Sequence, residues 1–401
     1  MMTIAASLIR ERTDWSGVTT VVAAGIVAAM QVGKGLIAGP MLQADLGLDL
    51  STLGWITSVF AVVGVVGGMA AGAFVTAAGD RRLLGIGMAL LAFGSIAGAA
   101  SPAFTLLLLA RIIEGFGFLL VVVAGPAILM RLVTPERRDL VFALWSCFMP
   151  AGMAIAMLTG PAFVDWQAIW WSNGLLTLAS LASIFLAVPP SRQTPRGATR
   201  FRDDAAETLT SRGPVLLFVL FSLYSLMSFT LSSFLPILLI ERLQVSLGTV
   251  GLLSAIITLV NVFGNLAAGH LLSRGFARGR LVASAALLTG VSGLWIFLSP
   301  SGGHLILALC VLFSAIGGLI PATLISSVPI LSPRPALAPM AMGLLMQGSN
   351  LGQLVGPVAV GTAIELYGWA SGAAFIGFSA LLCIVLTVPF ERTLRAKTQW
   401  Q

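Results

Sequence analysis

The stretch 50-LSTLGWITSVFAVVGVVGGMAAG-72 has a counterpart 197 positions later, 247-LGTVGLLSAIITLVNVFGNLAAG-269. Each stretch holds 23 mostly apolar residues, enough to cross a bilayer as one helix. Each ends in a run of small residues, which close helix approach in lipid requires. Further pairs follow in the same order at nearly the same shift: Pro40 with Pro236, Pro126 with Pro321, Gly152 with Gly348 and Gly160 with Gly356. Several ordered matches are hard to obtain by chance, so we predict a duplicated set of membrane-spanning helices.

The composition of the 401-residue chain excludes an ordinary water-soluble domain. Hydrophobic residues make up 58% and charged residues 9% of the chain, whereas soluble domains carry about 25% charged residues. Apolar runs between helix-breaking residues give twelve candidate spans. They cover approximately 17–41, 51–77, 83–100, 103–130, 139–163, 167–188, 213–239, 247–272, 281–299, 303–330, 336–362 and 366–390. The sequence therefore predicts an all-α membrane protein with twelve transmembrane helices in two pseudo-symmetric bundles of six.

Positive charge is concentrated in alternate loops. With the N-terminus placed in the cytoplasm, 19 of the 22 Lys and Arg residues fall in cytoplasmic segments, and only Arg242 falls in an outer loop. Basic loops are typical of the cytoplasmic side. We therefore predict a multi-pass protein of the inner membrane with both termini cytoplasmic. This location accounts for the net charge of +7 by orientation and by contact with anionic membrane lipid, so we expect no nucleic-acid partner.

The longest polar stretch, 189–212, divides the chain into two sets of six spans. It is rich in Pro, Arg and Asp. We predict that it is a cytoplasmic linker, with a short surface helix around 201–210, between an N-terminal bundle (1–188) and a C-terminal bundle (213–401).

Lys34 is a charged residue within the first span, where charge is costly and usually functional. Gln31 lies three residues earlier and so shares its helical face, and span one has no acidic residue of its own. One interpretation is that Lys34 and Gln31 bind substrate. The alternative is that Lys34 extends to the outer interface, since it lies only six residues from Pro40.

Arg111 and Glu114 are three residues apart in the fourth span, so they can pair on one helical face. In a structural interpretation, the two charges neutralise each other and stabilise the bundle. In a functional interpretation, Glu114 takes up a proton and changes the charge that Arg111 presents. The same spacing serves both roles, so the sequence leaves both open.

Polar stripes in the second half predict the lining of a central cavity. Span eight carries Ser254, Thr258, Asn261 and Asn265 on one face, span eleven carries Gln347, Asn350 and Gln353, and span seven carries Ser225, Ser228 and Ser232. Such stripes can also bond helix to helix. We predict that Asn261, Asn265, Gln347 and Asn350 bind substrate.

Three motifs resemble those of the major facilitator superfamily. The run from Gly72 to Arg82 resembles its gating loop through Gly72, Gly79, Asp80, Arg81 and Arg82, although Thr76 occupies the usual acidic position. That departure removes or moves the usual charge pair between helices.

The other two motifs lie in spans four and five. Arg111 to Gly115 resembles the superfamily's Arg-x-x-x-Gly motif, which is associated with proton coupling. Gly152 to Pro161 resembles the antiporter motif but lacks the glycine pair that should follow, having Val164 and Asp165 there. The chain is thus similar to this superfamily over essentially its whole length, and the tract 111–161 is loosely similar to the cyanate-permease and nitroimidazole-transporter group.

The resemblance implies a major facilitator fold that works by alternating access, with no enzymatic activity. We find no nucleotide-binding, metal-binding or nucleophile motif, so we expect no cofactor and no metal. We predict a secondary transporter, expected to be a monomer, for a small organic or inorganic anion bound by Lys34 and Arg111, with protons as the coupling ion. The alternatives are proton-coupled efflux of apolar drug-like compounds and, in another class, a membrane receptor that does not transport.

Overall fold

The chain is helical throughout the part that the structure describes. The computed structural model describes residues 13–47, 50–101, 103–190, 201–243, 247–299 and 303–398. Within these ranges there is no β-strand, which confirms the all-α prediction.

The helices of the first half precede the short helix α9, and those of the second half follow it. The first half contains α1 (Trp15–Ile37), α2 (Gly39–Leu46), α3 (Leu50–Ala78), α4 (Asp80–Ala99), α5 (Phe104–Leu132), η2 (Pro135–Arg137), α6 (Arg138–Ser146), α7 (Phe148–Thr159), η3 (Gly160–Ala162) and α8 (Trp166–Ala187). The connecting helix α9 (Phe201–Thr210) coincides with the surface helix predicted at 201–210. The second half contains α10 (Arg212–Leu243), α11 (Leu247–Ser273), α12 (Arg278–Leu298), α13 (His304–Gly317), α14 (Leu319–Leu331), η4 (Pro335–Leu337), α15 (Ala338–Tyr367) and α16 (Ala370–Thr398).

Ten helical segments among the described residues are long and apolar enough to cross a membrane. Two of them, Pro135–Thr159 and His304–Leu331, each join shorter helices. The helices α3 and α15 complete the twelve long segments of the two-bundle fold. The described side chains of α3 contribute the apolar segment Val59–Ala73, and α15 is more polar because it carries Gln347, Asn350 and Gln353.

The predicted continuous spans 139–163 and 303–330 are each interrupted, which corrects the sequence prediction. α6 ends at Ser146, four residues before Pro150, and α13 ends at Gly317, four residues before Pro321. A proline ring clashes with the carbonyl four residues earlier and lacks the N–H that would bond to it. Each break lies where its proline removes that bond, but Pro126 and Pro389 lie inside the continuous helices α5 and α16, so the surrounding packing also decides whether a helix ends.

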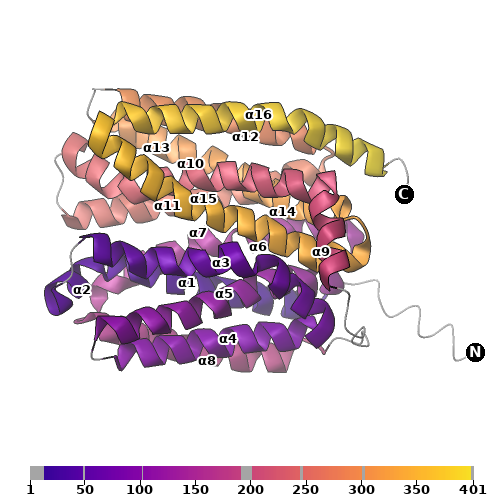
Figure 1. Ribbon diagram of the computed structural model, residues 1–401, viewed down its shortest axis with the longest axis horizontal. Helices are drawn as coiled ribbons and strands as arrows, with labels where there is room; N and C mark the ends of the chain where they lie inside the picture. The colour runs from indigo at the N-terminus through magenta and orange to yellow at the C-terminus, as the bar shows by residue number, and fades with distance from the viewer. Residues whose placement is uncertain are drawn as a thin grey trace, which may run out of the picture.

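The two halves form two layers, with α1, α3, α4, α5 and α8 in one and α10, α12, α15 and α16 in the other (Figure 1). Within the first layer α4 packs on α5 and α8, and within the second α10 packs on α15 and α12 on α16. Two seams join the halves: α3 packs on α15, and α6 and α7 pack on α11.

Small residues bring the two halves into backbone contact at both seams. A Cβ added to Gly68 of α3 would overlap the carbonyl oxygen of Gly343 on α15. At the other seam, a Cβ added to Gly269 of α11 would lie 2.5 Å from the Cβ of Ala143 on α6. Both contacts lie toward the C-terminal ends of α3 and α11, where those helices lead into arginine-rich loops. The halves are therefore closed against each other at the end that the sequence predicts to be cytoplasmic.

An ion pair joins the halves at this same end. The Arg278 guanidinium at the start of α12 donates to the Asp139 carboxylate on α6 across 2.7 Å, and to Ser326 Oγ on α14 across 2.6 Å. α9 and the C-terminal end of α16 also lie at this end (Figure 1). The start of α1 lies there too, since the backbone N–H of Asp14 donates to the carbonyl of Leu132 at the end of α5 across 3.0 Å.

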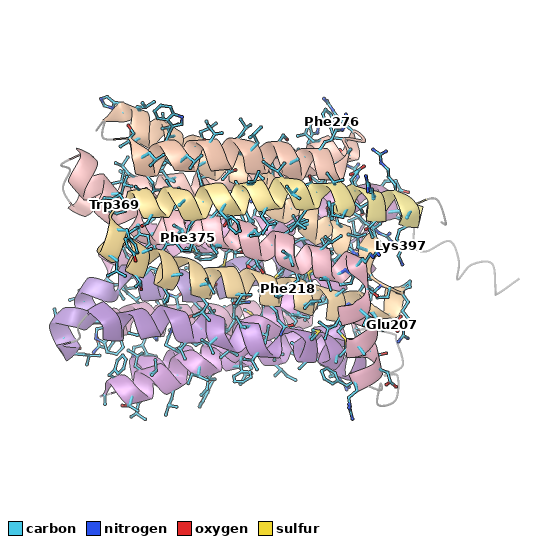
Figure 2. All side chains as sticks on the ribbon, turned by 45° about the horizontal axis from the view of Figure 1, so that its top comes forward. Glu207, Phe218, Phe276, Trp369, Phe375 and Lys397 are labelled. Carbon is cyan, nitrogen blue, oxygen red and sulfur yellow. The ribbon has the colours of Figure 1, made fainter. Side chains whose placement is uncertain are left out.

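Apolar side chains cover the outer surface of the bundle between its two ends (Figure 2). Phe93, Phe263 and Phe378 are 60%, 66% and 68% exposed, as lipid-facing residues of a membrane protein would be. Lys397 and Glu207 lie at one end of the molecule and Trp369 at the other (Figure 2).

Candidate functional site

A cavity of about 130 Å³ lies between the two halves. Residues of α5, α6 and α7 line it from the first half, and residues of α10, α11, α13, α14 and α15 line it from the second. Its aromatic wall is made by Phe118, Phe148, Phe221, Tyr224, Phe229 and Phe313. Because a cavity held between two such halves is alternately opened to each side in transporters built from repeats, it is the candidate solute site.

The polar groups that line the cavity are hydroxyls and amides. The predicted stripe of α10 faces it, and so do parts of the predicted stripes of α11 and α15: Ser225, Ser228, Ser232, Thr258, Asn261, Asn350 and Gln353. Ser146, Ser314 and Ser349 add further hydroxyls. Among the described residues that line this cavity, none is charged.

Two of the four predicted amide ligands lie off the cavity wall. Asn265 is fully buried behind Asn261 and donates to its side-chain oxygen across 2.8 Å. Gln347 crosses the α3–α15 seam instead and donates to the carbonyl of Val65 across 2.6 Å. Asn261 and Asn350 do line the cavity. Polar residues on one face of a helix thus have two roles: some line the cavity, and others form hydrogen bonds within the helix packing.

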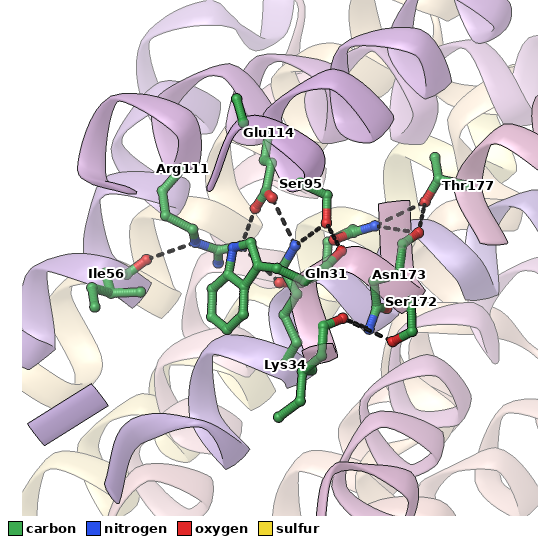
Figure 3. Close-up of polar contacts among 12 residues, drawn as sticks. Gln31, Lys34, Ile56, Ser95, Arg111, Glu114, Ser172, Asn173 and Thr177 are labelled. Atoms are coloured by element: carbon green, nitrogen blue, oxygen red, sulfur yellow. Dashed lines mark hydrogen bonds and ion pairs between the residues drawn. The ribbon is translucent and has the colours of Figure 1, made fainter. Parts of the chain in front are cut away.

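The buried charges of the first half form one cluster, in which Glu114 lies between Lys34 and Arg111 (Figure 3). Lys34 Nζ donates to Glu114 Oε1 across 2.7 Å, and Arg111 Nη1 donates to Glu114 Oε2. All three side chains are fully buried. The pairing of Arg111 with Glu114 that the spacing predicted is confirmed, and the interpretation of Lys34 as an interfacial residue is wrong.

Neighbouring helices supply further contacts to both cations. Lys34 Nζ also donates to Ser95 Oγ across 2.7 Å and lies 4.6 Å from the centre of the Trp170 ring. Arg111 Nη1 donates to the carbonyl of Gln31 across 2.8 Å, and Arg111 Nε donates to the carbonyl of Ile56 across 3.2 Å. The hydrogen bonds of both cations are drawn in Figure 3. Buried charges persist only when paired and hydrogen-bonded in this way.

Two glycines make room for the cluster. A Cβ added to Gly94 of α4 would lie 2.7 Å from Glu114 Cγ, so only glycine lets α4 approach the carboxylate side chain. A Cβ added to Gly35 of α1 would lie 3.4 Å from Arg111 Nη2. Within the described structure Arg111 Nη2 and Gln31 Oε1 are buried without a hydrogen-bond partner.

The cluster lies one layer behind the cavity wall. Lys34, Arg111 and Gln31 are not among the residues that line the cavity, although they were predicted as substrate ligands. The Arg111 guanidinium lies 4.6 Å from the centre of the Phe60 ring, and that ring is 5.0 Å from the ring of Phe118, which lines the cavity. Glu114 and Phe118 are four residues apart on α5 and so lie on the same face of that helix.

The predicted gating loop contains an ion pair between helices. Gly79 links α3 to α4 with φ at 87°, a conformation that favours glycine. The next residue, Asp80, accepts hydrogen bonds of 2.9 and 3.2 Å from Arg131 on α5. Asp80 therefore supplies the carboxylate that the family pattern places at position 76. It pairs with Arg131 within the first half.

The other three residues of that loop have separate surroundings. A Cβ added to Gly72 would lie 2.6 Å from Met340 Cα on α15. Arg81 donates to the carbonyl of Phe185 across 2.6 Å, and Arg82 is exposed. Only Gly72 of these contacts the second half, so a gating role for the loop stays a prediction.

Sequence reasoning missed three participants in the site. Tyr224 lines the cavity beside Asn261, and Ser95 and Trp170 hold Lys34. Tyr224 is one of only two tyrosines in the chain, and a tyrosine within an apolar span was an available signal because its hydroxyl needs a partner when buried. The described residues hold no group of three His, Cys, Asp or Glu side chains that could bind a metal ion.

Comparison with known proteins agrees with this architecture. The human organic anion transporter MFSD10 (TETRAN) superposes with a TM-score of 0.80 at 20% identity, covering 94% of this chain and 100% of that one. At this identity the likeness shows the fold alone.

Two relatives are similar in sequence. The chloramphenicol resistance protein of Streptomyces lividans is 25% identical over 92% of this chain and 97% of its own length. The 3-(3-hydroxy-phenyl)propionate transporter of Escherichia coli K12 is 28% identical over 52% of this chain, which spans only about half the length of that relative (52%). Residues 21–338 match the sequence profile of the Major Facilitator Superfamily. This match covers most of the chain and agrees with the two-bundle fold, so the chain belongs to the Major Facilitator Superfamily of membrane transporters.

Proposed function

We propose that this transporter exports uncharged, aromatic, drug-sized solutes in exchange for protons. The observation that carries the proposal is the cavity wall, in which six aromatic rings alternate with hydroxyl and amide groups and the described lining residues include no charge. An ion entering such a site would lose its hydration without gaining a counter-charge, which is costly. A neutral ring system with a few polar atoms would stack on the aromatic wall and keep its hydrogen bonds.

The Streptomyces relative supports the direction of transport. It is named for resistance to chloramphenicol, an uncharged aromatic compound, and it matches this chain along nearly its whole length. Resistance through a transporter requires removal of the compound from the cytoplasm. We therefore assign export rather than uptake.

The buried cluster supplies the proton site in this proposal. With all three groups ionised, Lys34, Arg111 and Glu114 carry a net charge of +1. A proton on Glu114 would leave two cations without their shared partner, so protonation favours separation of α1 from α5. The link from Glu114 to Phe118 along α5 then couples proton binding to the shape of the cavity.

An organic anion is the second candidate substrate. The net positive charge of the cluster and the unpartnered Arg111 Nη2 favour it, because a mobile anion is the natural compensation for a buried positive charge. The relative named for transport of an aromatic acid is consistent with it. This alternative requires a conformation in which Lys34 or Arg111 reaches the cavity, which it does not in the closed arrangement described above.

Flux into and out of proteoliposomes separates the two candidates. The purified transporter is reconstituted, a pH gradient is imposed, and movement of radiolabelled chloramphenicol and of 3-(3-hydroxyphenyl)propionate is followed. We expect chloramphenicol to move in the direction opposite to proton flow, and we expect no transport of 3-(3-hydroxyphenyl)propionate. Transport of the acid alone would overturn the assignment in favour of the anion.

The same assay tests the role of Glu114 in proton coupling. Glu114→Gln should still exchange labelled for unlabelled chloramphenicol but should no longer respond to the pH gradient. Glu207→Gln, which changes a surface carboxylate on α9, should behave as the unmodified protein. A pH-driven flux that survives Glu114→Gln would remove Glu114 from the coupling mechanism.

A further inference from the structure

Three side chains of the second half form a hydrogen-bonded relay that ends at the cavity. Asn265 Nδ2 donates to Asn261 Oδ1 across 2.8 Å and to the Asn261 carbonyl across 2.9 Å. Asn261 Nδ2 in turn donates to the Ser314 carbonyl across 2.8 Å and to the Tyr224 hydroxyl oxygen across 3.4 Å. Asn265 is fully buried, whereas Asn261 and Tyr224 line the cavity.

The relay fixes which way the Asn261 amide points. Its oxygen accepts from Asn265, and its two N–H groups are directed at Ser314 and Tyr224. Because an amide NH₂ can only donate, Tyr224 accepts at this contact. Reversing the amide would bring two N–H groups of Asn261 and Asn265 together and two oxygens of Asn261 and Ser314 together.

The contact with Asn261 does not use the O–H proton of Tyr224. Ser228, one turn after Tyr224 on α10, also lines the cavity. A tyrosine hydroxyl has one O–H proton in addition to the lone pairs through which it accepts. Since Asn261 bonds to Tyr224 through one of those lone pairs and the hydroxyl lines the cavity, its O–H proton can be donated to a solute.

The surroundings define what a solute must present. The Tyr224 ring stacks on Phe221 at 6.0 Å with an interplanar angle of 23°, and Phe313 and Phe148 line the same cavity. A flat ring lying among these faces would bring a substituent oxygen to the tyrosine hydroxyl. The pair of amides has no equivalent in the first half, where the positions 197 residues earlier are Gly64 and Gly68.

We propose that the Asn265–Asn261–Tyr224 relay is the specificity determinant of the cavity, selecting ring compounds that carry a hydrogen-bond acceptor oxygen. Tyr224 contacts the solute through its hydroxyl. Asn265 is a positioning residue that acts through Asn261 without touching the solute. The proposal rests on the cavity being the solute site, and it adds the chemistry by which that site discriminates.

The test measures equilibrium binding of chloramphenicol to purified protein in detergent by titration calorimetry, apart from any flux. Tyr224→Phe removes only the hydroxyl and should weaken binding about 3- to 10-fold, the worth of one hydrogen bond. Asn265→Ala should weaken binding to a similar extent, although Asn265 does not line the cavity. Ser254→Ala is the matched control, since Ser254 is a buried hydroxyl on the same helix that does not line the cavity; its affinity should not change.

The double variant decides between positioning and general damage. If Asn265 acts only through Tyr224, Asn265→Ala in the Tyr224→Phe background should cause no further loss. Losses that simply add, or wild-type affinity in Tyr224→Phe, would overturn the relay while chloramphenicol transport by the unmodified protein still upholds the proposed function.

The remaining outcomes are also decisive. If the unmodified protein binds 3-(3-hydroxyphenyl)propionate and not chloramphenicol, the proposed neutral substrate is wrong. The same three variants then test the relay with the acid, whose carboxylate is also an acceptor, and unchanged affinity in Tyr224→Phe would reject it. Binding of neither probe would reject the relay and the proposed substrate class together.

Discussion

The two halves share one architecture but differ in where their polar chemistry lies. In the first half Lys34, Arg111 and Glu114 are fully buried behind the cavity wall, where Glu114 pairs with both cations. In the second half uncharged groups such as Asn261 and Tyr224 lie on the wall itself. The paired atoms of the cluster have little left for a ligand, although Arg111 Nη2 has no partner, whereas hydroxyls and amides keep open bonding positions. In the proposed function, the first half would supply the ion chemistry and the second half the solute recognition.

The two seams between the halves also differ in the residues that form them. Gly64 and Gly68 let α3 lie directly against α15, whereas the corresponding residues of α11 are Asn261 and Asn265. The glycine seam leaves no room beside it, since a Cβ on Gly64 would overlap the Asn350 side chain. Of the two amides of α11, Asn261 lines the cavity and Asn265 is buried behind it. Replacement of the two glycines by amides thus adds one amide to a polar lining that α10, α13 and α15 also supply.

The largest effect is expected from breaking the charged cluster. Glu114→Leu leaves Lys34 and Arg111 buried without a counter-charge and should destabilise the protein by about 3–5 kcal/mol. Thermal unfolding in detergent should report a marked fall in Tm. The double variant Lys34→Met/Glu114→Leu restores the net charge of +1 and should recover much of that loss. A double variant no more stable than the single one would contradict mutual neutralisation as the role of the pair.

The glycine seam provides the next largest effect. Gly68→Ala places a methyl group against the Gly343 carbonyl, so it should oppose closure at the arginine-rich end and reduce transport about tenfold or more. A cysteine at Ser349, on the cavity wall, should label faster from that end in this variant. Gly251→Ala is the control, because a Cβ there meets no other atom within 4 Å. Equal transport rates in the two alanine variants would show that the seam does not limit the cycle.

The ion pair between the halves should affect conformation more than stability. Asp139→Asn removes the charge that holds Arg278 across the halves and should shift the equilibrium between closed and open forms about 3- to 10-fold toward opening at that end. Asp80→Asn breaks a pair within the first half and should lower Tm without that shift. Labelling of the cavity cysteine and thermal unfolding together distinguish the two effects. Identical labelling rates and Tm values for the two variants would mean that it makes no difference whether an ion pair joins the two halves or lies within one.

The smallest effect is expected where charge is exposed. Arg334 is about half exposed and pairs with Glu207 across 3.1 Å at the end of the molecule. Glu207→Gln should change stability by about 0–1 kcal/mol, and 1 M salt should remove the difference. Chemical unfolding with and without salt measures it. A loss as large as that of Glu114→Leu would contradict the view that the contribution of an ion pair in this protein depends on its burial.

Much of the architecture was predictable because it depends on composition and local chemistry. The linker helix at 201–210 and the pairing of Arg111 with Glu114 were predicted from the chain and confirmed by the structure. Pro150 and Pro321 mark positions where a helix can break, since a proline acts on the carbonyl four residues before it. The sequence does not distinguish them from Pro126 and Pro389, which lie inside continuous helices. The predicted apolar spans were correct in outline and wrong only in their continuity.

The candidate site was predictable only in part. The α11 stripe correctly indicated polar lining, but helical periodicity could not separate Asn261, on the cavity wall, from Asn265, one turn farther and fully buried. The partner of Lys34 could not be identified from the sequence, because Glu114 lies 80 residues away on another span. The absence of an acidic residue from span one therefore did not mean that Lys34 lacks an acidic partner.

The sequence by itself determined that the chain is an all-α, duplicated membrane protein, because hydrophobicity, small-residue patterns and prolines act over one helix turn or one span. The tertiary structure alone decided which polar groups meet. Whether a buried cation is neutralised or left for a ligand depends on which helices approach it, and that is fixed by close contacts such as Gly94 against Glu114 and Gly68 against Gly343. Helix packing between distant spans therefore placed the charges behind the wall, and it placed Asn261 and Asn350 on the wall.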